Sequence, residues 1–105
     1  MSREELNEIL ELHKKWIEGD KIGKRANLKG ANLRHADLDY SCLPLWCGSL
    51  RVHMDDKQVK QLLYHTLSIV KYSNNVSEDL KAALLTETNL TIANQFHRVD
   101  ECGEL

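Results

Sequence analysis

Residues 26–45 repeat with a period of five residues. Each repeat begins with a small residue and carries a leucine two positions later. The small residues are Ala26, Ala31, Ala36 and Ser41, and the leucines are Leu28, Leu33, Leu38 and Leu43. A helix has a period of 3.6 residues and a strand a period of two, so neither would keep all four leucines on one side. The pattern predicts a coil that turns one corner per repeat, with the leucines and small residues inside.

This segment resembles the Ala-(Asp/Asn)-Leu-X-X pattern of pentapeptide-repeat proteins. The resemblance implies a right-handed, four-sided β-helix, of which four repeats make about one coil. Two further stretches, residues 43–48 and 96–103, resemble small pentapeptide-repeat proteins of phages and prophages, which carry an N-terminal helix and a C-terminal helical extension. The resemblance implies no activity.

The first residues predict a helix over 2–18. Ser2 and Glu5 have the spacing of a capping box, and Gly19 is a stop signal. Apolar and aromatic residues recur on one face of this segment: Leu6, Ile9, Leu10, His13, Trp16 and Ile17. We expect this face to cover one end of the coil, because repeat architectures need caps, with His13 and Trp16 packed inside.

The second half of the chain predicts a helical hairpin over the other end of the coil. Residues 50–54 alternate as in a short strand, and Asp55 or Asp56 then caps a helix over about 57–72. The residues expected to face inward on that helix are Val59, Leu62, Leu63, Thr66, Leu67 and Val70. Ser77 caps another helix, which we expect to kink or open at residues 86–92, where helix formers are few.

The predicted fold is therefore α+β: an N-terminal α-helix caps about one coil of right-handed quadrilateral β-helix, followed by a C-terminal helical hairpin. We expect one domain over residues 1–105, with segments 1–25, 26–54 and 55–105. A single coil with incompletely covered ends also favours a homo-oligomer.

Composition argues against several classes of partner. The 105 residues carry a net charge of −2, and no segment is basic enough to bind duplex nucleic acid. The chain has no long apolar run and no export signal pattern, which argues against a membrane partner. Three cysteines in such a chain favour free thiols. We expect a cytoplasmic protein, in the host cytoplasm if a phage encodes it.

No catalytic motif is recognisable. The sequence has no Gly-rich phosphate loop, no Gly-X-Ser-X-Gly and no His-Glu-X-X-His, so we expect a non-enzymatic protein without a cofactor. Zinc is a minor alternative, in which the ligands would be Cys42, Cys47, His97 and Cys102. Asp55 and Asp56 could be metal ligands, but their position directly before a helix favours a role as helix caps.

A set of aromatic, arginine and asparagine residues forms the candidate ligand site. Aromatic faces stack on bases, arginine binds phosphate and asparagine reads hydrogen-bonding edges. The set is Trp46, Arg51, Tyr64, His65, Asn94, Phe96, His97 and Arg98. The alternative is structural: Trp46 and Phe96 are core residues, His65 is a surface residue, and Arg98 pairs with Asp100 or Glu101.

Two functions follow. In the first, a small phage-type protein sequesters a nucleotide-derived host defence signal in a pocket built from this set, as an anti-defence sponge. In the second, the chain is a protein-interaction module that inhibits a host protein through the repeat face or an exposed helix. The coil residues expected to make the second contact are Lys29, Arg34, His35, Asp39 and Tyr40.

Overall fold

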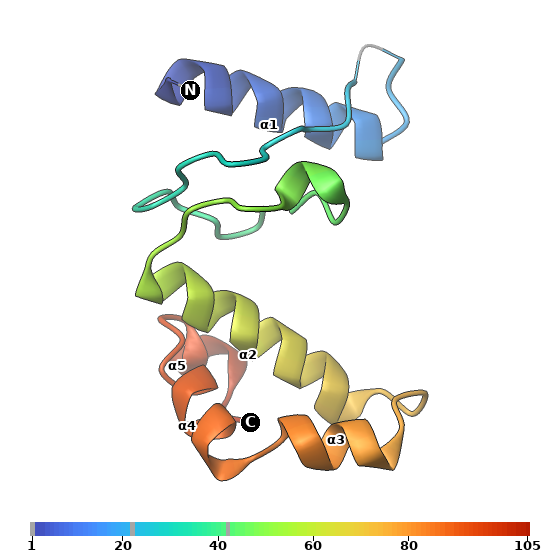
Figure 1. Ribbon diagram of the computed structural model, residues 1–105, viewed down its shortest axis with the longest axis vertical. Coiled ribbons are helices and arrows are strands. Elements are labelled where there is room, and N and C mark those ends of the chain that lie inside the picture. The colour runs from blue at the N-terminus through green and yellow to red at the C-terminus, as the bar shows by residue number, and fades with distance from the viewer. Residues whose placement is uncertain (1, 22, 42) are drawn as a thin grey trace. The chain divides into compact units, whose positions relative to one another are not determined.

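The structure is a computed structural model that describes residues 2–21, 23–41 and 43–105. The chain divides into two compact units, Met1–Met54 and Asp55–Leu105 (Figure 1). Each unit has its own hydrophobic cluster.

Unit 1 begins with helix α1, Arg3–Ile17. The Ser2 hydroxyl accepts a hydrogen bond from the Glu5 amide at 3.1 Å, as the capping motif predicts. Gly19, at φ 81°, follows the end of the helix in the left-handed region that glycine adopts without a steric cost. Helix α1 buries Leu6 and His13. Trp16 is 48% exposed, so the prediction that it is packed inside is wrong.

The repeats turn a corner every five residues. The amides of Ala31, Ala36 and Ser41 donate to the carbonyls of Leu28, Leu33 and Leu38, at 2.8, 3.0 and 3.1 Å. The third residue of each turn is left-handed, as in a type II turn: Gly30, His35 and Tyr40. Before each corner a side-chain oxygen accepts from the amide two residues on, and these acceptors are Asn27, Asn32 and Asp37. The repeat is therefore a series of three hydrogen-bonded corners.

The chain returns alongside itself after twenty residues, or four repeats. The amide of Leu28 donates to the Gly48 carbonyl at 2.5 Å, and that of Gly30 to the Leu50 carbonyl at 3.0 Å. Leu33 and His53 continue this pattern, in which the Leu33 amide donates to the His53 carbonyl at 2.7 Å. Backbone hydrogen bonds thus join the first two repeats to residues 48–53.

The predicted right-handed quadrilateral β-helix is nevertheless wrong. Over the described ranges the protein is helical, with no strand or sheet, and it shows one isolated parallel bridge between Asn32 and His53. One coil supplies each segment with a neighbour on one side at most, and the described repeats form backbone hydrogen bonds across the coil only with residues 48–53, so no ladder of strands develops. The strand predicted over residues 50–54 is wrong too, because Arg51 has φ 60° and interrupts the extended chain.

The core of unit 1 lies between α1 and the first two repeats. It consists of Leu6, Ala26, Leu28, Ala31 and Leu33. The later repeats are less well covered, since Leu38 and Leu43 are half-buried and Ser41 is exposed. The small residues and leucines are therefore buried as predicted in the first two repeats, and they are less buried in the last two.

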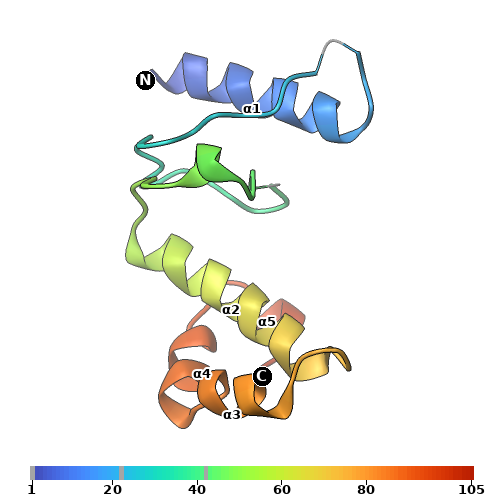
Figure 2. The same cartoon turned by 45° about the vertical axis from the view of Figure 1, so that its right-hand side comes forward.

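Unit 2 contains four helices where a hairpin was predicted (Figure 2). They are α2 Asp56–Tyr72, α3 Glu78–Leu84, α4 Glu87–Ala93 and α5 Val99–Cys102. The run that we expected to open forms α4, because the Thr86 hydroxyl accepts from the Asn89 amide and caps a new helix. None of the helices in the described ranges is long and apolar enough to cross a membrane.

Helix α2 packs against α3 and α4. A capping box at Asp55 and Gln58 starts it. The core consists of Tyr64, Leu67, Ala93 and Phe96. Two residues expected to face inward do not: Val59 is 52% exposed and Thr66 is exposed. The predicted inward face of α2 is therefore partly wrong.

Candidate functional site

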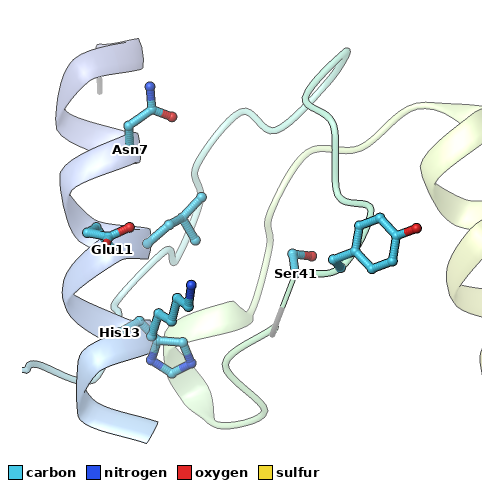
Figure 3. Close-up of a pocket in the computed structure, with 7 residues that line it drawn as sticks. Asn7, Glu11, His13 and Ser41 are labelled. Atoms are coloured by element: carbon cyan, nitrogen blue, oxygen red, sulfur yellow. The ribbon is translucent and has the colours of Figure 1, made fainter. Parts of the chain in front are cut away.

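A groove of about 380 Å³ in unit 1 separates α1 from the third corner of the repeats (Figure 3). Asn7, Glu11 and His13 come from α1, and Ser41 lies across the groove from them. The full lining is Asn7, Leu10, Glu11, His13, Lys14, Tyr40 and Ser41. Nothing in the sequence marks the α1 side as a site, because Asn7, Glu11 and Lys14 have the pattern of the solvent face of an amphipathic helix.

A second cavity, of about 230 Å³, adjoins this groove and shares Asn7, Leu10 and Ser41 with it. Its lining is mostly apolar and includes Leu6 and all four repeat leucines. Arg3 and Asp37 are its charged members. We call the two cavities together the α1 groove. It has an apolar floor and a polar rim, the usual make-up of a binding cleft.

His13 is structural. It is 3% exposed, its Nδ1 accepts a hydrogen bond from the Ala26 amide at 3.0 Å, and its ring stacks on Trp16 at 5.8 Å. Accepting at Nδ1 requires that this nitrogen carry no proton. His13 therefore joins α1 to the first repeat, in agreement with the predicted packing role.

Tyr40 is the most unusual side chain beside the α1 groove. It occupies a left-handed corner at φ 61° and is 88% exposed. Left-handed backbone is disfavoured for bulky residues, and burial in the core does not compensate here. Leu45, the last residue of the fourth repeat, is also 88% exposed. Two large side chains thus project from the end of the repeat segment.

Trp46 and Arg51, two predicted ligand residues, lie in unit 1. The indole Nε1 of Trp46 donates to the Ala26 carbonyl at 2.7 Å, and the Arg25 guanidinium lies 3.7 Å from the ring centroid. A Cβ on Gly48 would overlap the same ring. These contacts agree with the structural alternative for Trp46. Arg51 is an exposed, left-handed residue.

The other six predicted ligand residues lie in unit 2, where three of them surround the ring of Phe96, itself one of the six. Its ring centroid lies 4.8 Å from that of Tyr64, 5.5 Å from His65 and 5.0 Å from His97. Phe96 and Tyr64 are 3% and 5% exposed. The sequence thus identified a real aromatic cluster, and its two central rings belong to the core.

Asn94 and Arg98 hold the C-terminal end of the chain. The Asn94 side chain accepts from the Leu105 amide at 2.8 Å and donates to the Leu105 carbonyl at 3.4 Å. Arg98 forms an ion pair with Glu101 at 2.5 Å, one of the two partners that the structural alternative proposed. Both side chains have partners within unit 2.

We expect unit 2 to lose stability in alkali through Tyr64. Burial raises the pKa of this phenol above its usual 10.0, and the nearby Cys102 and Tyr72 add to the shift. Its hydroxyl donates to the Gly103 carbonyl at 2.6 Å, which only the neutral form can do. Because the folded pKa exceeds the unfolded one, the stabilisation is complete below pH 10 and is lost as pH rises through the folded pKa.

Tyr64→Phe tests this expectation. The variant should lose about 1 kcal/mol at pH 7, since one hydrogen bond to the Gly103 carbonyl is removed. Its stability should also fall less than that of the wild type between pH 9 and 11, as measured by urea unfolding. Parallel pH profiles for the two proteins would show that Tyr64 does not control the alkaline transition.

Metal ligands do not gather in the part of the chain that the structure describes: no three histidine, cysteine or acidic side chains lie together there. Of the proposed zinc set, Cys42 lies outside the described residues. Cys47 is exposed in unit 1, and Cys102 is exposed in unit 2. Asp55 caps α2 through the Gln58 amide at 3.0 Å, which agrees with the capping interpretation.

Comparison with known proteins finds one similarity. No curated protein and no solved structure matches the chain. The comparisons do not bear on a phage or prophage origin, which stays a prediction. Residues 24–44 match the family model described as pentapeptide repeats (8 copies). The segment that forms the three corners of unit 1 thus consists of pentapeptide repeats.

Proposed function

We propose that the protein is a non-catalytic interaction module that binds a partner protein through unit 1. The contact surface consists of the corner at Asp39–Tyr40, the α1 groove beside it and the exposed corners of the earlier repeats. The family match supports the class of function, because pentapeptide repeats suggest a protein-interaction module.

The main observation that supports the proposal is the exposure of Tyr40. A left-handed tyrosine costs about 1–2 kcal/mol of backbone energy relative to the usual conformation. At 88% exposure, the ring recovers little of that cost from burial. Tyrosine is also enriched among the residues that dominate binding energy in interfaces. A ring held out of the core beside a groove is well placed to anchor a partner.

The neighbouring corners supply a polar rim. Lys29, Arg34 and His35 are exposed on the first two corners. Arg34 is oriented by its own repeat, since its Nε donates to Asn32 Oδ1 at 3.3 Å. Interfaces commonly combine a central aromatic anchor with a polar rim, and rim charges affect association more than final affinity. Of the coil residues predicted for protein contact, Asp39 is half-buried, and the others are exposed.

Tyr40→Gly should abolish partner binding and leave the fold intact. Glycine adopts the left-handed corner freely, so the free energy of unfolding should change by no more than about 1 kcal/mol. His35→Gly is the matched comparison, because it makes the same backbone change one corner earlier; as a rim residue, His35 should affect final affinity much less than Tyr40. Binding is measured by quantitative affinity capture from a lysate of the source organism, and stability by thermal unfolding.

A partner retained by the wild type and by His35→Gly, and lost by Tyr40→Gly, would support the proposal. Identical capture by all three proteins would reject Tyr40 as the anchor. Capture lost equally in both variants would assign binding to the corners in general and contradict the special role of the third corner.

A second candidate function is sequestration of a nucleotide-derived small molecule, with an anti-defence role if the protein is encoded by a phage. One observation favours it: His65 and His97, both exposed, flank the ring of Phe96, and Arg98 follows directly in the chain. Exposed imidazoles beside an aromatic ring are suited to stacking, and arginine is suited to phosphate.

Thermal-shift measurements with nucleotides, cyclic dinucleotides and ADP-ribose test this candidate. Binding at a hundredfold excess over Kd stabilises the folded state by about 2.7 kcal/mol, which gives a shift of several degrees. Arg98→Ala should reduce the shift, and Lys81→Ala, on α3, should not. Recovery of the unchanged compound after denaturation would distinguish sequestration from turnover. No shift with any of these compounds would reject the candidate.

A further inference from the structure

His13 has one nitrogen that no residue in the described ranges uses. Its Nδ1 accepts from the Ala26 amide, so the ring is neutral and carries its proton on Nε2, which donates. No hydrogen bond from Nε2 forms within those ranges. The ring is 3% exposed, yet Nε2 is not sealed in the core, because no described side-chain nitrogen is fully buried without a partner. The Nε2–H group is therefore a fixed donor at the α1 groove, which His13 lines (Figure 3).

The apolar part of the α1 groove is a space that the core of unit 1 leaves unfilled. Protein cores contain few voids larger than a water molecule, whereas this cavity measures about 230 Å³. All four repeat leucines line it, and Leu38 and Leu43 are only half-buried, so an apolar group in the cavity would cover them. An apolar cavity of about 150 Å³ binds benzene. This cavity therefore has room for a leucine, methionine or phenylalanine side chain.

The donor and the apolar cavity lie one helical turn apart. Leu10 lines both parts of the groove, and His13 follows it by three residues on the same face of α1. Three residues advance a helix by about 4.5 Å, and one residue advances an extended peptide by about 3.3 Å. A side chain in the cavity and a backbone carbonyl at His13 can therefore come from neighbouring residues of one peptide.

The charges around the groove favour an uncharged acceptor. Arg3 and Lys14 are balanced by Glu11 and Asp37, and His13 is neutral. A carboxylate or phosphate ligand would approach two acidic groups as well as two basic ones, and its burial would cost desolvation of an ion. A carbonyl oxygen carries no such cost and pairs with a neutral N–H donor.

We propose that the α1 groove binds an uncharged peptide segment of the partner protein. A leucine, methionine or phenylalanine side chain of this segment fills the apolar cavity, and a backbone carbonyl accepts from His13 Nε2–H. The inference rests on the proposed function, in which the groove is part of the contact surface, and it adds the chemistry of the partner. Tyr40, which also lines the groove, contacts the residues that flank the anchor.

Binding of N-acetyl-leucine N-methylamide to the full chain tests the proposal. This compound carries one leucine side chain between two amide carbonyls. In ¹H–¹⁵N NMR titrations we expect saturable shifts of the amides of α1 and of Tyr40 and Ser41, with a millimolar dissociation constant. The His13 Nε2 resonance should move with the same constant. N-acetyl-alanine N-methylamide should bind at least about tenfold more weakly, because it lacks the side chain that fills the cavity.

The variant His13→Asn separates the donor from the contact with the first repeat. The asparagine side-chain oxygen lies near the position of Nδ1 and keeps an acceptor for the Ala26 amide, whereas no atom remains at Nε2. We expect this variant to bind the leucine compound about fivefold more weakly. Glu8→Gln, an exposed change on α1 outside the groove, should leave the affinity unchanged. Thermal unfolding verifies that both variants fold.

Three outcomes would overturn the proposal: no saturable shift up to about 100 mM, equal affinities for the leucine and alanine compounds, or an Nε2 resonance that stays in place while the leucine compound binds. None of the three depends on the variant. If the compound does not bind and partner capture still depends on Tyr40, this inference alone fails. If the compound binds and Tyr40→Gly captures as much partner as the wild type, the proposed function alone fails.

Discussion

Leu28→Ala is expected to lower the free energy of unfolding of unit 1 by about 3–5 kcal/mol. Leu28 is 0% exposed and belongs to the cluster formed by Leu6, Ala31 and Leu33. Removing a fully buried leucine side chain loses its transfer free energy and leaves a cavity, and such substitutions commonly cost 2–5 kcal/mol. Since its amide also bonds to the Gly48 carbonyl, we expect the return of the chain at residue 48 to loosen as well.

Leu38→Ala is the matched control for this prediction. Leu38 has the same place in its repeat and is only half-buried, so the same substitution should cost about 1 kcal/mol. Urea unfolding followed by tryptophan fluorescence is a suitable measurement, because both tryptophans, Trp16 and Trp46, lie in unit 1. Equal losses for the two variants would show that the early repeats are packed no better than the late ones.

Phe96→Ala is expected to cost about 3–5 kcal/mol in unit 2. The ring is 3% exposed and lies against Tyr64 at 4.8 Å, and large-to-small substitutions of buried aromatics have costs of this size. Loss of the ring also removes the surface on which His65 and His97 are arranged. The measurement is thermal unfolding by circular dichroism at 222 nm, since unit 2 holds most of the helix.

Two further variants separate a core role of Phe96 from a ligand role. Phe96→Leu keeps most of the apolar volume and should cost less than the alanine variant. His97→Ala removes an exposed ring and should change stability by less than about 0.5 kcal/mol. A Phe96→Ala protein as stable as the wild type would contradict the core assignment and support the ligand assignment.

Local features of the fold could be read from the sequence. The capping residues Ser2, Asp55 and Ser77 act as predicted, because a cap needs only a side-chain oxygen and an amide three residues on. The five-residue period correctly placed Ala26, Leu28, Ala31 and Leu33 inside. In these cases the determining interactions lie within a few residues.

Features that depend on distant neighbours were predicted poorly. A β-helix needs extended segments that pair on both sides, and the described repeats pair only with residues 48–53. On α2, hydrophobicity predicted that Val59 faces inward, whereas Gln58 is 2% exposed and Val59 is 52% exposed. Which face of a helix is buried depends on what packs against it, and periodicity in one segment does not specify that.

The candidate sites show the same difference between local features, which the sequence predicts, and features that depend on distant residues, which it does not. The sequence identified the residue types that cluster around Phe96, because they are close together in the chain or share α2. It could not predict that the Trp46 indole donates to the Ala26 carbonyl and stacks against the Arg25 guanidinium, about twenty residues away in the chain. Nor could it predict that α1 and the third corner form a groove. Those contacts arise only when separate segments pack.

The sequence by itself determined where the chain turns and where its helices begin, since corner and cap hydrogen bonds join residues two to three positions apart. The tertiary structure alone decided that the repeats form hydrogen-bonded corners without a sheet. It also left Tyr40, Val59 and Ile69 exposed. Burial and backbone pairing across twenty residues depend on surfaces that exist only after the segments have packed.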